Sequence, residues 1–242
     1  MGMIIRIGHL YPDMLNLYGD RGNIIALTQR MNARGIEVQT DRITMGKSFN
    51  ADDYDILFIG GGQDFEQDVL LDDLKRGKDL QINKAIHNGT VFLAICGGYQ
   101  MLGKYYKTYD GKMLEYMGAL DFYTEGREER MIGNYAFKTK EGIEVVGFEN
   151  HSGRTYLGSD VEPLGKMIKG YGNNGEDGTE GVRYKNTFGT YSHGPILPKN
   201  SKFADLLISK AVENKYGTAK LEPLDDTLEH KAQKQVMKLY IK

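Results

Sequence analysis

The single cysteine of the chain is the residue best placed to do chemistry. Cys96 follows the apolar run Thr90–Ile95 and is followed by two glycines, Gly97 and Gly98. This pattern is typical of a nucleophile elbow, in which a buried strand delivers a side chain to a sharp turn and a helix begins directly after it. The start of such a helix favours a thiolate. The alternative, a structural cysteine buried at a strand end, does not require the exposed turn that the glycines provide.

A second glycine-rich loop is expected beside this thiol. Gly60, Gly61 and Gly62 end the apolar run Asp55–Ile59, and the carboxyl ends of parallel strands meet at one edge of a sheet. The loop, through Gly62, can turn a backbone N–H toward an oxyanion, with the N–H of Gly97 as the second donor. Without a neighbouring thiol the loop is equally well explained as a tight turn between a strand and a helix.

A thiol nucleophile needs a base, and the chain has 5 histidines. Three of them have an ordinary core or surface explanation: His9 in a strand, His87 at a helix end and His230 in a charged tail. The other two, His151 and His193, lie in glycine-flanked loops. His193 follows the apolar strand Phe188–Tyr191, so its ring would project where that strand ends at the sheet edge. We therefore predict His193 as the general base.

Composition excludes several other classes of function. The 242 residues carry 31 Lys and Arg against 33 Asp and Glu, a net charge of -2, so the chain has no basic field for binding nucleic acid. One cysteine cannot form an internal disulfide or a cysteine-rich metal centre, and no metal site is predicted. No run of about 18 apolar residues or signal peptide is found. We expect a cytoplasmic protein.

The elements that must position these residues alternate through the first hundred residues. We predict strands at 4–10, 36–43, 55–59 and 90–95, and helices at 23–34 and 69–87. Continuously apolar strands between helices indicate a parallel sheet that is covered on both faces. The first half is therefore predicted to be a doubly wound α/β domain.

The pattern of apolar and turn-forming residues changes after Met113. We predict short strands at 131–138, 143–148, 167–171, 181–184 and 188–191. Gly, Asn and Asp residues separate them, which suggests hairpins. A helix is predicted at 201–214 with Ser201 as its N-cap, and a charged amphipathic helix from Asp225 to Lys242. Because no linker or internal repeat interrupts the chain, we predict one domain over residues 1–242, with a helical tail at about 225–242.

Three segments together resemble a known family, the class I glutamine amidotransferase domains of the cobyric acid synthase type: Ala94–Gln100, Gly60–Gly62 and Gly189–Gly194. Longer strings are similar, within that group, to the GatD family of glutaminase subunits of lipid II isoglutaminyl synthases: Leu15–Asn23, Val146–His151 and His193–Asn200. The resemblance extends from Leu15 to Asn200. It implies a flavodoxin-like α/β fold, a mostly parallel sheet with helices on both faces and added hairpins.

The resemblance also implies an activity, the hydrolysis of glutamine to glutamate and ammonia without a cofactor in this subunit. The ammonia would pass to a ligase of the MurT type, a Mur ligase that forms a heterodimer with this subunit. That partner would use ATP and Mg to activate the α-carboxyl of D-glutamate in lipid II and amidate it during peptidoglycan synthesis. Such a subunit would work in the cytoplasm near the inner face of the membrane.

Roles for single residues follow from the same resemblance. Cys96 would form a γ-glutamyl thioester, and His193 would take the thiol proton and later protonate the departing ammonia. Gln100 matches the last position of the family's C-x-G-x-Q pattern and would contact glutamine. Arg130 matches an arginine that would bind the α-carboxylate of the substrate, although its charged surroundings alone suggest a solvated residue.

The sequence departs from the wider class at one position. Class I triads carry a glutamate two residues after the histidine, where this chain has Pro195. A residue that orients His193 must therefore come from elsewhere or be missing, and Asp20 and Glu149 are the candidates. Two other interpretations stay open: a cobyric-acid-type or other glutaminase domain, and a non-catalytic binding module of the same fold with a structural Cys96.

Overall fold

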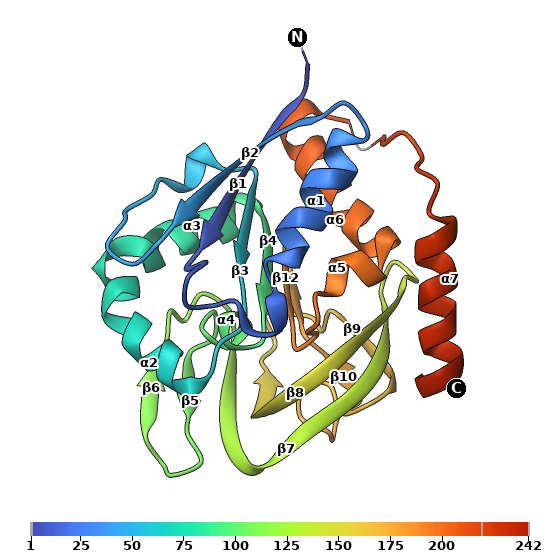
Figure 1. Cartoon of the computed structure of the whole chain (residues 1–242). Coiled ribbons are helices and arrows are strands. Elements are labelled where there is room, and N and C mark those ends of the chain that lie inside the picture. The colour runs from blue at the N-terminus through green and yellow to red at the C-terminus, as the bar shows by residue number, and fades with distance from the viewer. Residues whose placement is uncertain (1, 219, 242) are drawn as a thin grey trace.

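A six-stranded sheet forms the centre of the computed structural model in Figure 1, which describes residues 2–218 and 220–241. Its strand order is β11-β12-β4-β3-β1-β2, and all neighbours are parallel except β11 and β12. The strands are β1 (Ile4–Leu10), β2 (Glu37–Ile43), β3 (Ile56–Ile59), β4 (Val91–Ile95), β11 (Val182–Tyr184) and β12 (Thr187–Thr190). The predicted mostly parallel α/β fold is confirmed.

Helices cover both faces of this sheet (Figure 1). On one side lie α1 (Gly22–Asn32), α5 (Ile196–Lys199) and α6 (Ser201–Tyr216); on the other lie α2 (Asp64–Asp73) and α3 (Asp79–Asn88). Every residue of β3 and β4 is buried, which explains why both strands are continuously apolar in sequence. Short helical turns, η1 (Leu17–Gly19) and η2 (Ala51–Asp53), lie in the loops.

A second, mostly antiparallel sheet carries the long hairpin β7–β8. Its order is β10-β9-β7-β5-β6, with β8 paired to β7. The strands are β5 (Tyr105–Lys107), β6 (Met113–Glu115), β7 (Phe122–Thr139), β8 (Glu144–Leu157), β9 (Gly165–Lys169) and β10 (Thr179–Glu180). The predicted strands 131–138 and 143–148 cover only one end of β7 and β8. The other end was missed because β7 there carries exposed charged residues at 127–130, which hide any apolar alternation.

The predicted helix at 69–87 is wrong in its start and its continuity. The helix α2 begins at Asp64, where the Glu66 side chain accepts a hydrogen bond from the Gln63 N–H at 2.9 Å. A wide turn, η3 (Leu74–Lys78), then separates α2 from α3, because Gly77 has a φ of 111°, which a helix cannot contain.

The predicted strand 188–191 is also placed differently. It corresponds to β12, which pairs in parallel with β4 in the central sheet as well as antiparallel with β11. It is therefore more than one arm of a hairpin, and this pairing brings the loop that contains His193 to the edge where β4 ends at Cys96.

The two C-terminal helices are close to the prediction, apart from one cap. Ser201 is the first residue of α6 and not its N-cap; Asn200 precedes it and uses its side-chain oxygen to accept a hydrogen bond from the Val146 N–H at 2.9 Å. The tail contains α7 (Thr227–Val236) and a wide turn, η4 (Met237–Ile241). Within the described residues no helix combines the length and the apolar character needed to cross a membrane.

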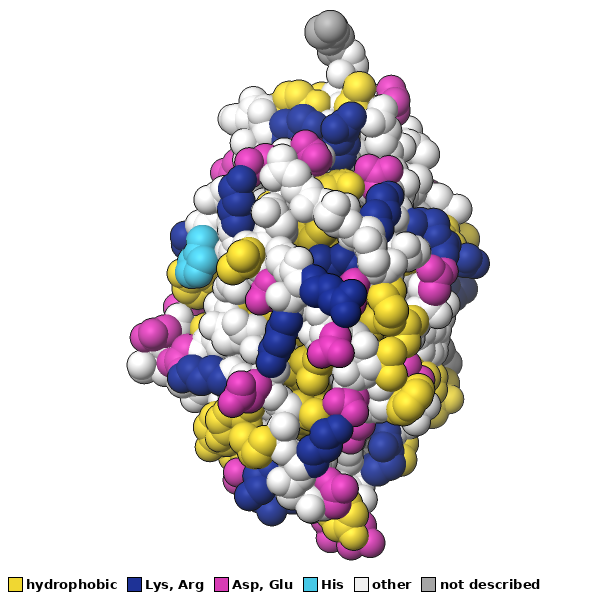
Figure 2. All heavy atoms as spheres, turned by 90° about the vertical axis from the view of Figure 1, so that its left-hand side faces the viewer, with side chains coloured by type: hydrophobic (Ala, Val, Ile, Leu, Met, Phe, Trp, Pro, Cys, Tyr) yellow, Lys and Arg dark blue, Asp and Glu magenta, His cyan; other side chains and the backbone are white. Residues whose placement is uncertain are grey.

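The face that carries α2 and α3, on the left in Figure 1, is shown in Figure 2. Acidic and basic side chains are interspersed over the described part of this face. This distribution agrees with the near balance of 31 Lys and Arg against 33 Asp and Glu.

Candidate active site

Cys96 lies at a strained turn between β4 and the short helix α4 (Gly97–Gln100). Its φ of 46° and ψ of -106° are rare for a residue with a Cβ, and such backbone strain is concentrated at functional sites. The turn is possible only because the next residues are small. A Cβ at Gly97 would lie 2.6 Å from the Gly62 carbonyl oxygen, and one at Gly98 would lie 2.6 Å from that of Gly60. The two glycine-rich loops therefore touch, as the sequence predicted.

One backbone N–H group in each of these two loops is free to bind a ligand. Neither the N–H of Gly62 nor that of Gly97 has a hydrogen-bond partner among the described residues. Cys96, which is 6% exposed, directly precedes Gly97 in the chain. Two free N–H groups beside a thiol are what an oxyanion hole requires.

A cavity of about 220 Å³ opens over the thiol. It is smaller than the roughly 300–1,000 Å³ of pockets that hold drug-sized ligands, so it suits a molecule the size of an amino acid. Three other residues predicted to contact substrate line it together with Cys96: Gly62, Gln100 and Arg130. Gly97 and His193 do not line it; Gly97 packs against Gly62 and His193 is buried.

His193 lies directly behind the glycine loop, together with Asp20. A Cβ at Gly61 would lie 2.7 Å from His193 Cε1, 3.1 Å from Asp20 Oδ2 and 3.4 Å from Cys96 Cβ, so all three side chains converge on this glycine. The His193 Nδ1 atom is 3.6 Å from Asp20 Oδ2, an ion-pair distance longer than a hydrogen bond. Asp20 Oδ2 also accepts a hydrogen bond from the Gly61 N–H at 2.8 Å.

This setting controls the charge of the His193 ring. Burial by itself would lower the pKa of His193, but the negative charges of Cys96 and Asp20 outweigh it and raise that pKa to about 10. His193 is therefore protonated at neutral pH. A protonated imidazole beside a thiol favours the thiolate.

Glu149, the other candidate for orienting His193, faces a different histidine. Its two carboxylate oxygens accept hydrogen bonds from the backbone N–H groups of Tyr171 at 2.8 Å and Gly172 at 3.0 Å. Its Oε2 atom lies 3.8 Å from His151 Nε2. Of the two carboxylates, only Asp20 is placed beside His193.

His151 is a member of the cavity wall that sequence reasoning set aside in favour of His193. Its ring stacks on Tyr191 with the centroids 3.6 Å apart, and its Nδ1 is 2.8 Å from the Gly153 carbonyl oxygen. A carbonyl can only accept, so Nδ1 carries the proton. Burial lowers the pKa of His151 more strongly than Glu149 raises it. This ring is therefore neutral at neutral pH.

Gln100 is held by a buried polar network that the sequence did not reveal. The Gln67 amide donates to Gln100 Oε1 at 3.1 Å, and Gln100 Nε2 donates to the Tyr191 hydroxyl at 3.2 Å. The Tyr116 hydroxyl donates to Gln67 Oε1 at 2.6 Å. These partners come from α2, from the loop after β12 and from the loop after β6, and no local motif connects them.

Arg130 reaches the same cavity from the β7–β8 hairpin. It is exposed, as its sequence surroundings suggest, yet its guanidinium is fixed by Asn150 on β8. Nε donates to Asn150 Oδ1 at 2.9 Å and Nη2 donates to the Asn150 carbonyl at 3.1 Å. The position is compatible with binding a carboxylate in the cavity.

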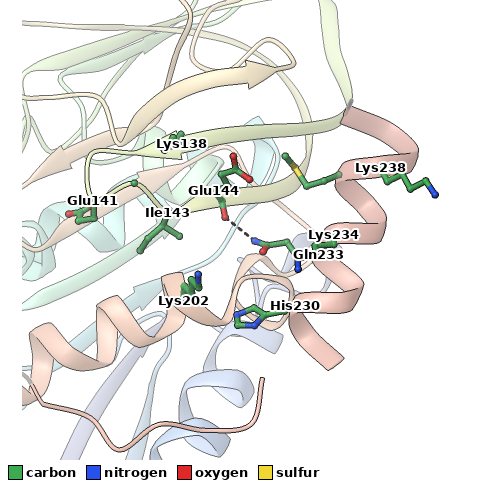
Figure 3. Close-up of a pocket in the computed structure, with 11 residues that line it drawn as sticks. Lys138, Glu141, Ile143, Glu144, Lys202, His230, Gln233, Lys234 and Lys238 are labelled. Atoms are coloured by element: carbon green, nitrogen blue, oxygen red, sulfur yellow. Dashed lines mark hydrogen bonds between the residues drawn. The ribbon is translucent and has the colours of Figure 1, made fainter. Parts of the chain in front are cut away.

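A larger hollow, of about 810 Å³, lies elsewhere on the molecule (Figure 3). It is bounded by α7, η4, the N-terminal part of α6 and the turn between β7 and β8, where Gln233 donates to the Glu144 carbonyl at 2.9 Å. It contains neither Cys96 nor His193. No cluster of potential metal ligands occurs in the part of the chain that the structure describes.

Residues 6–201 match the family model of the CobB/CobQ-like glutamine amidotransferase domain. The chain belongs to this family. This confirms the family resemblance that was identified from the sequence motifs. A solved glutamine amidotransferase from Thermotoga maritima, 16% identical, superposes with a TM-score of 0.56 over 97% of this chain and 92% of its own, which supports the fold.

Relatives within the family have two kinds of name. The lipid II isoglutaminyl synthase (glutamine-hydrolyzing) subunit GatD of Staphylococcus aureus is 47% identical, covering 96% of this chain and 94% of that protein. Its namesake from Streptococcus pneumoniae is 45% identical, covering 88% and 82%. A probable cobyric acid synthase of Methanothermobacter thermautotrophicus is 34% identical, covering 72% of this chain and only 36% of the synthase.

Proposed function

We propose that this chain is the glutaminase subunit of a lipid II isoglutaminyl synthase. The observation that carries the proposed glutaminase activity is the strained Cys96 in the wall of a small cavity, with His193, Asp20 and Cys96 converging on Gly61. The lipid II assignment is supported by relatives of that name that match almost end to end, whereas the cobyric acid synthase match covers 36% of that protein.

The chemistry begins with the thiolate that protonated His193 favours. Cys96 Sγ attacks the γ-carboxamide carbon of glutamine, a C–S bond forms, and the carbonyl π electrons move to oxygen. The N–H groups of Gly62 and Gly97 stabilise that oxyanion. When it collapses, the C–N bond breaks and His193 gives its proton to the departing nitrogen, which leaves as ammonia.

The γ-glutamyl thioester is then hydrolysed by the same groups. His193, now neutral, takes a proton from water as the water oxygen attacks the thioester carbon. A second oxyanion forms on the same two N–H groups and collapses with cleavage of the C–S bond. The product leaves as a γ-carboxylic acid and becomes glutamate when it releases the second water proton to solvent, and Cys96 and His193 return to the thiolate and imidazolium pair.

Asp20 takes the place of the missing triad glutamate in this proposal. Its carboxylate is close enough to keep His193 protonated and oriented, and its hydrogen bond to the Gly61 N–H ties that role to the oxyanion loop. Asp20 is therefore a positioning residue, which acts on the reaction through His193 and Gly61.

The ammonia is proposed to pass to a MurT-type Mur ligase in a heterodimer. That partner would hold ATP and Mg and amidate the D-glutamate α-carboxyl of lipid II, at the cytoplasmic side of the membrane. The name of the relatives, a subunit of a synthase, supports the existence of a partner. This chain needs no cofactor for the steps described.

The test compares the two nitrogen sources of the purified ligase complex. Cys96→Ala is expected to abolish amidation of lipid II with glutamine while leaving amidation with ammonium unchanged. The ammonium reaction controls for folding and assembly of the complex. Glutamine-dependent amidation that survives in Cys96→Ala would contradict the proposal, and a glutamine-analogue electrophile that leaves Cys96 unmodified would favour a non-catalytic binding module.

A further inference from the structure

The walls of the Cys96 cavity carry one positive and one negative side chain. Among its described lining residues, Arg130 is the only lysine or arginine and Asp64 is the only carboxylate. They reach the cavity from different elements, Arg130 from β7 and Asp64 from the first position of α2. Within the described residues they form no ion pair with each other or with any third residue. Opposite charges that face one cavity without pairing are suited to a ligand that carries both charges.

Asp64 is held in place but keeps an oxygen free. The Tyr106 hydroxyl, buried and also in the cavity wall, donates to Asp64 Oδ2 at 3.1 Å. The other oxygen, Oδ1, has no hydrogen bond among the described residues. Asp64 is an exposed residue that lines the cavity. Burial raises the pKa of its carboxyl, while Tyr106 and the charge of Arg130 lower it, so Arg130 is within electrostatic reach.

Arg130 is oriented in a corresponding way. Asn150 occupies its Nε and one terminal nitrogen, Nη2, and Asn150 is itself hydrogen-bonded to the Tyr18 hydroxyl. The remaining nitrogen, Nη1, has no partner among the described residues. Each charged group thus has one side fixed by the protein and another available to a ligand.

We propose that Asp64 binds the α-ammonium group of free glutamine while Arg130 binds its α-carboxylate, which makes Asp64 a specificity-determining residue of the glutaminase site. This inference rests on the proposed function. An α-amino acid carries both charges on one carbon, and a site that pairs both would select free glutamine over glutamine whose amino group is acylated, as in a peptide. Leaving Asp64 unpaired would disfavour such substrates.

A structural role for Asp64 predicts something different. An acidic residue in the first turn stabilises a helix, and Asp64 also accepts a hydrogen bond from Tyr106. If that were its whole purpose, replacing Asp64 would affect every substrate of Cys96 equally. The two roles are separated by a substrate that has the γ-carboxamide and a carboxylate but no amino group.

The experiment measures ammonia release by the ligase complex from glutamine and from glutaramate, the monoamide of glutaric acid. For Asp64→Asn we expect kcat/KM on glutamine to fall roughly 10- to 100-fold, mostly through KM, as for loss of a hydrogen bond to a charged group. On glutaramate we expect no change beyond about twofold, because the lost partner is absent. Asp68→Asn is the matched control: Asp68 lies one turn further along α2 and pairs with Lys112 on the surface, so both substrates should be unaffected.

Equal losses on both substrates, or no loss on either, would overturn the inference. If Asp64→Asn does not fold, the test uses Asp64→Glu, which keeps the negative charge but changes its position. The selectivity of this variant for glutamine over glutaramate should fall. Unchanged selectivity overturns the inference. Wild-type complex that releases no ammonia from glutamine would refute the proposed function itself, a result distinct from any of these.

Discussion

Two buried histidine–carboxylate pairs lie near the Cys96 cavity, and they differ in charge. His193 Nδ1 is 3.6 Å from Asp20 Oδ2, and His151 Nε2 is 3.8 Å from Glu149 Oε2. Neither ring is more than 3% exposed. Yet the pKa of His193 is raised to about 10, whereas that of His151 is lowered.

The neighbours of each pair explain the difference. Burial opposes protonation of both rings, but His193 faces the negative charges of both Cys96 and Asp20. His151 has a single carboxylate beside it, Glu149, and the positive charge of Arg154 acts together with burial to lower the pKa of His151. Two similar histidine–carboxylate pairs therefore differ in protonation: His193 is protonated and His151 is neutral at neutral pH. The charges around each pair decide which state is favoured.

The largest expected effect on glutaminase activity comes from replacing the two histidines themselves. His193→Asn should lower glutaminase kcat by roughly 10²- to 10⁴-fold, the usual contribution of a general acid–base group. His151→Asn should lower it by less than about tenfold, because a neutral wall residue transfers no proton. Steady-state glutaminase assays of the ligase complex, with surface His87→Asn as the control, measure both. The reverse order of the two losses would contradict the comparison.

A smaller effect is expected at the carboxylates. Asp20→Asn should lower kcat/KM by about 100-fold, less than the roughly 10⁴-fold loss seen when a hydrogen-bonded triad aspartate is replaced. It should also move the alkaline limb of the pH profile to lower pH. Asp20 raises the pKa of His193, so its removal lets that pKa fall from about 10 toward the ordinary 6.5.

Glu149→Gln provides the matched control for Asp20. It leaves the charges around His193 in place, so the alkaline limb should not move, although the loss of a charged acceptor for two backbone N–H groups should lower the melting temperature. An unshifted limb in Asp20→Asn, or an equal shift in Glu149→Gln, would show that Asp20 does not set the charge of His193.

The smallest effect concerns stability and pH. Because the pKa of His151 lies below its unfolded value of 6.5, the unfolded chain gains a proton first as pH falls, and wild-type stability decreases below that pH. The raised pKa of His193 acts in the opposite sense: its contribution is present below 6.5 and is lost as pH rises toward about 10. Urea unfolding at about pH 7.5 and about pH 5 should therefore show a smaller acid loss in His151→Asn than in wild type. An identical loss would contradict this assignment.

The sequence predicted those parts of the fold that local pattern determines. The fully buried strands β3 and β4 were placed to within one residue, since continuous apolar runs are unambiguous when both faces of a sheet are covered. The break at Gly77 was missed because a glycine inside a helical pattern is usually tolerated. The long hairpin β7–β8 was underestimated because β7 carries charged residues at 127–130 and the missed part of β8 buries polar side chains, among them Glu149, His151 and Thr155, so that neither strand shows apolar alternation there.

The candidate site also has a part that could be predicted from the sequence and a part that could not. Cys96 and the glycine loops form contiguous motifs, so the contact between the loops could be anticipated from sequence. Asp20 and Glu149 could not be told apart, because only the folded chain shows which carboxylate lies beside His193. Asp64 gave no signal, since its importance arises from sharing a cavity with a residue on another element.

The central claim, that His193 carries a proton while His151 does not, can be measured by NMR titration of the histidine ring nitrogens. Spectra of His193→Asn and His151→Asn assign the two rings. We predict that His193 stays protonated through neutral pH and titrates near 10, that this value falls in Cys96→Ala, and that His151 is neutral with its proton on Nδ1. A neutral His193 or a protonated His151 at neutral pH would contradict the account.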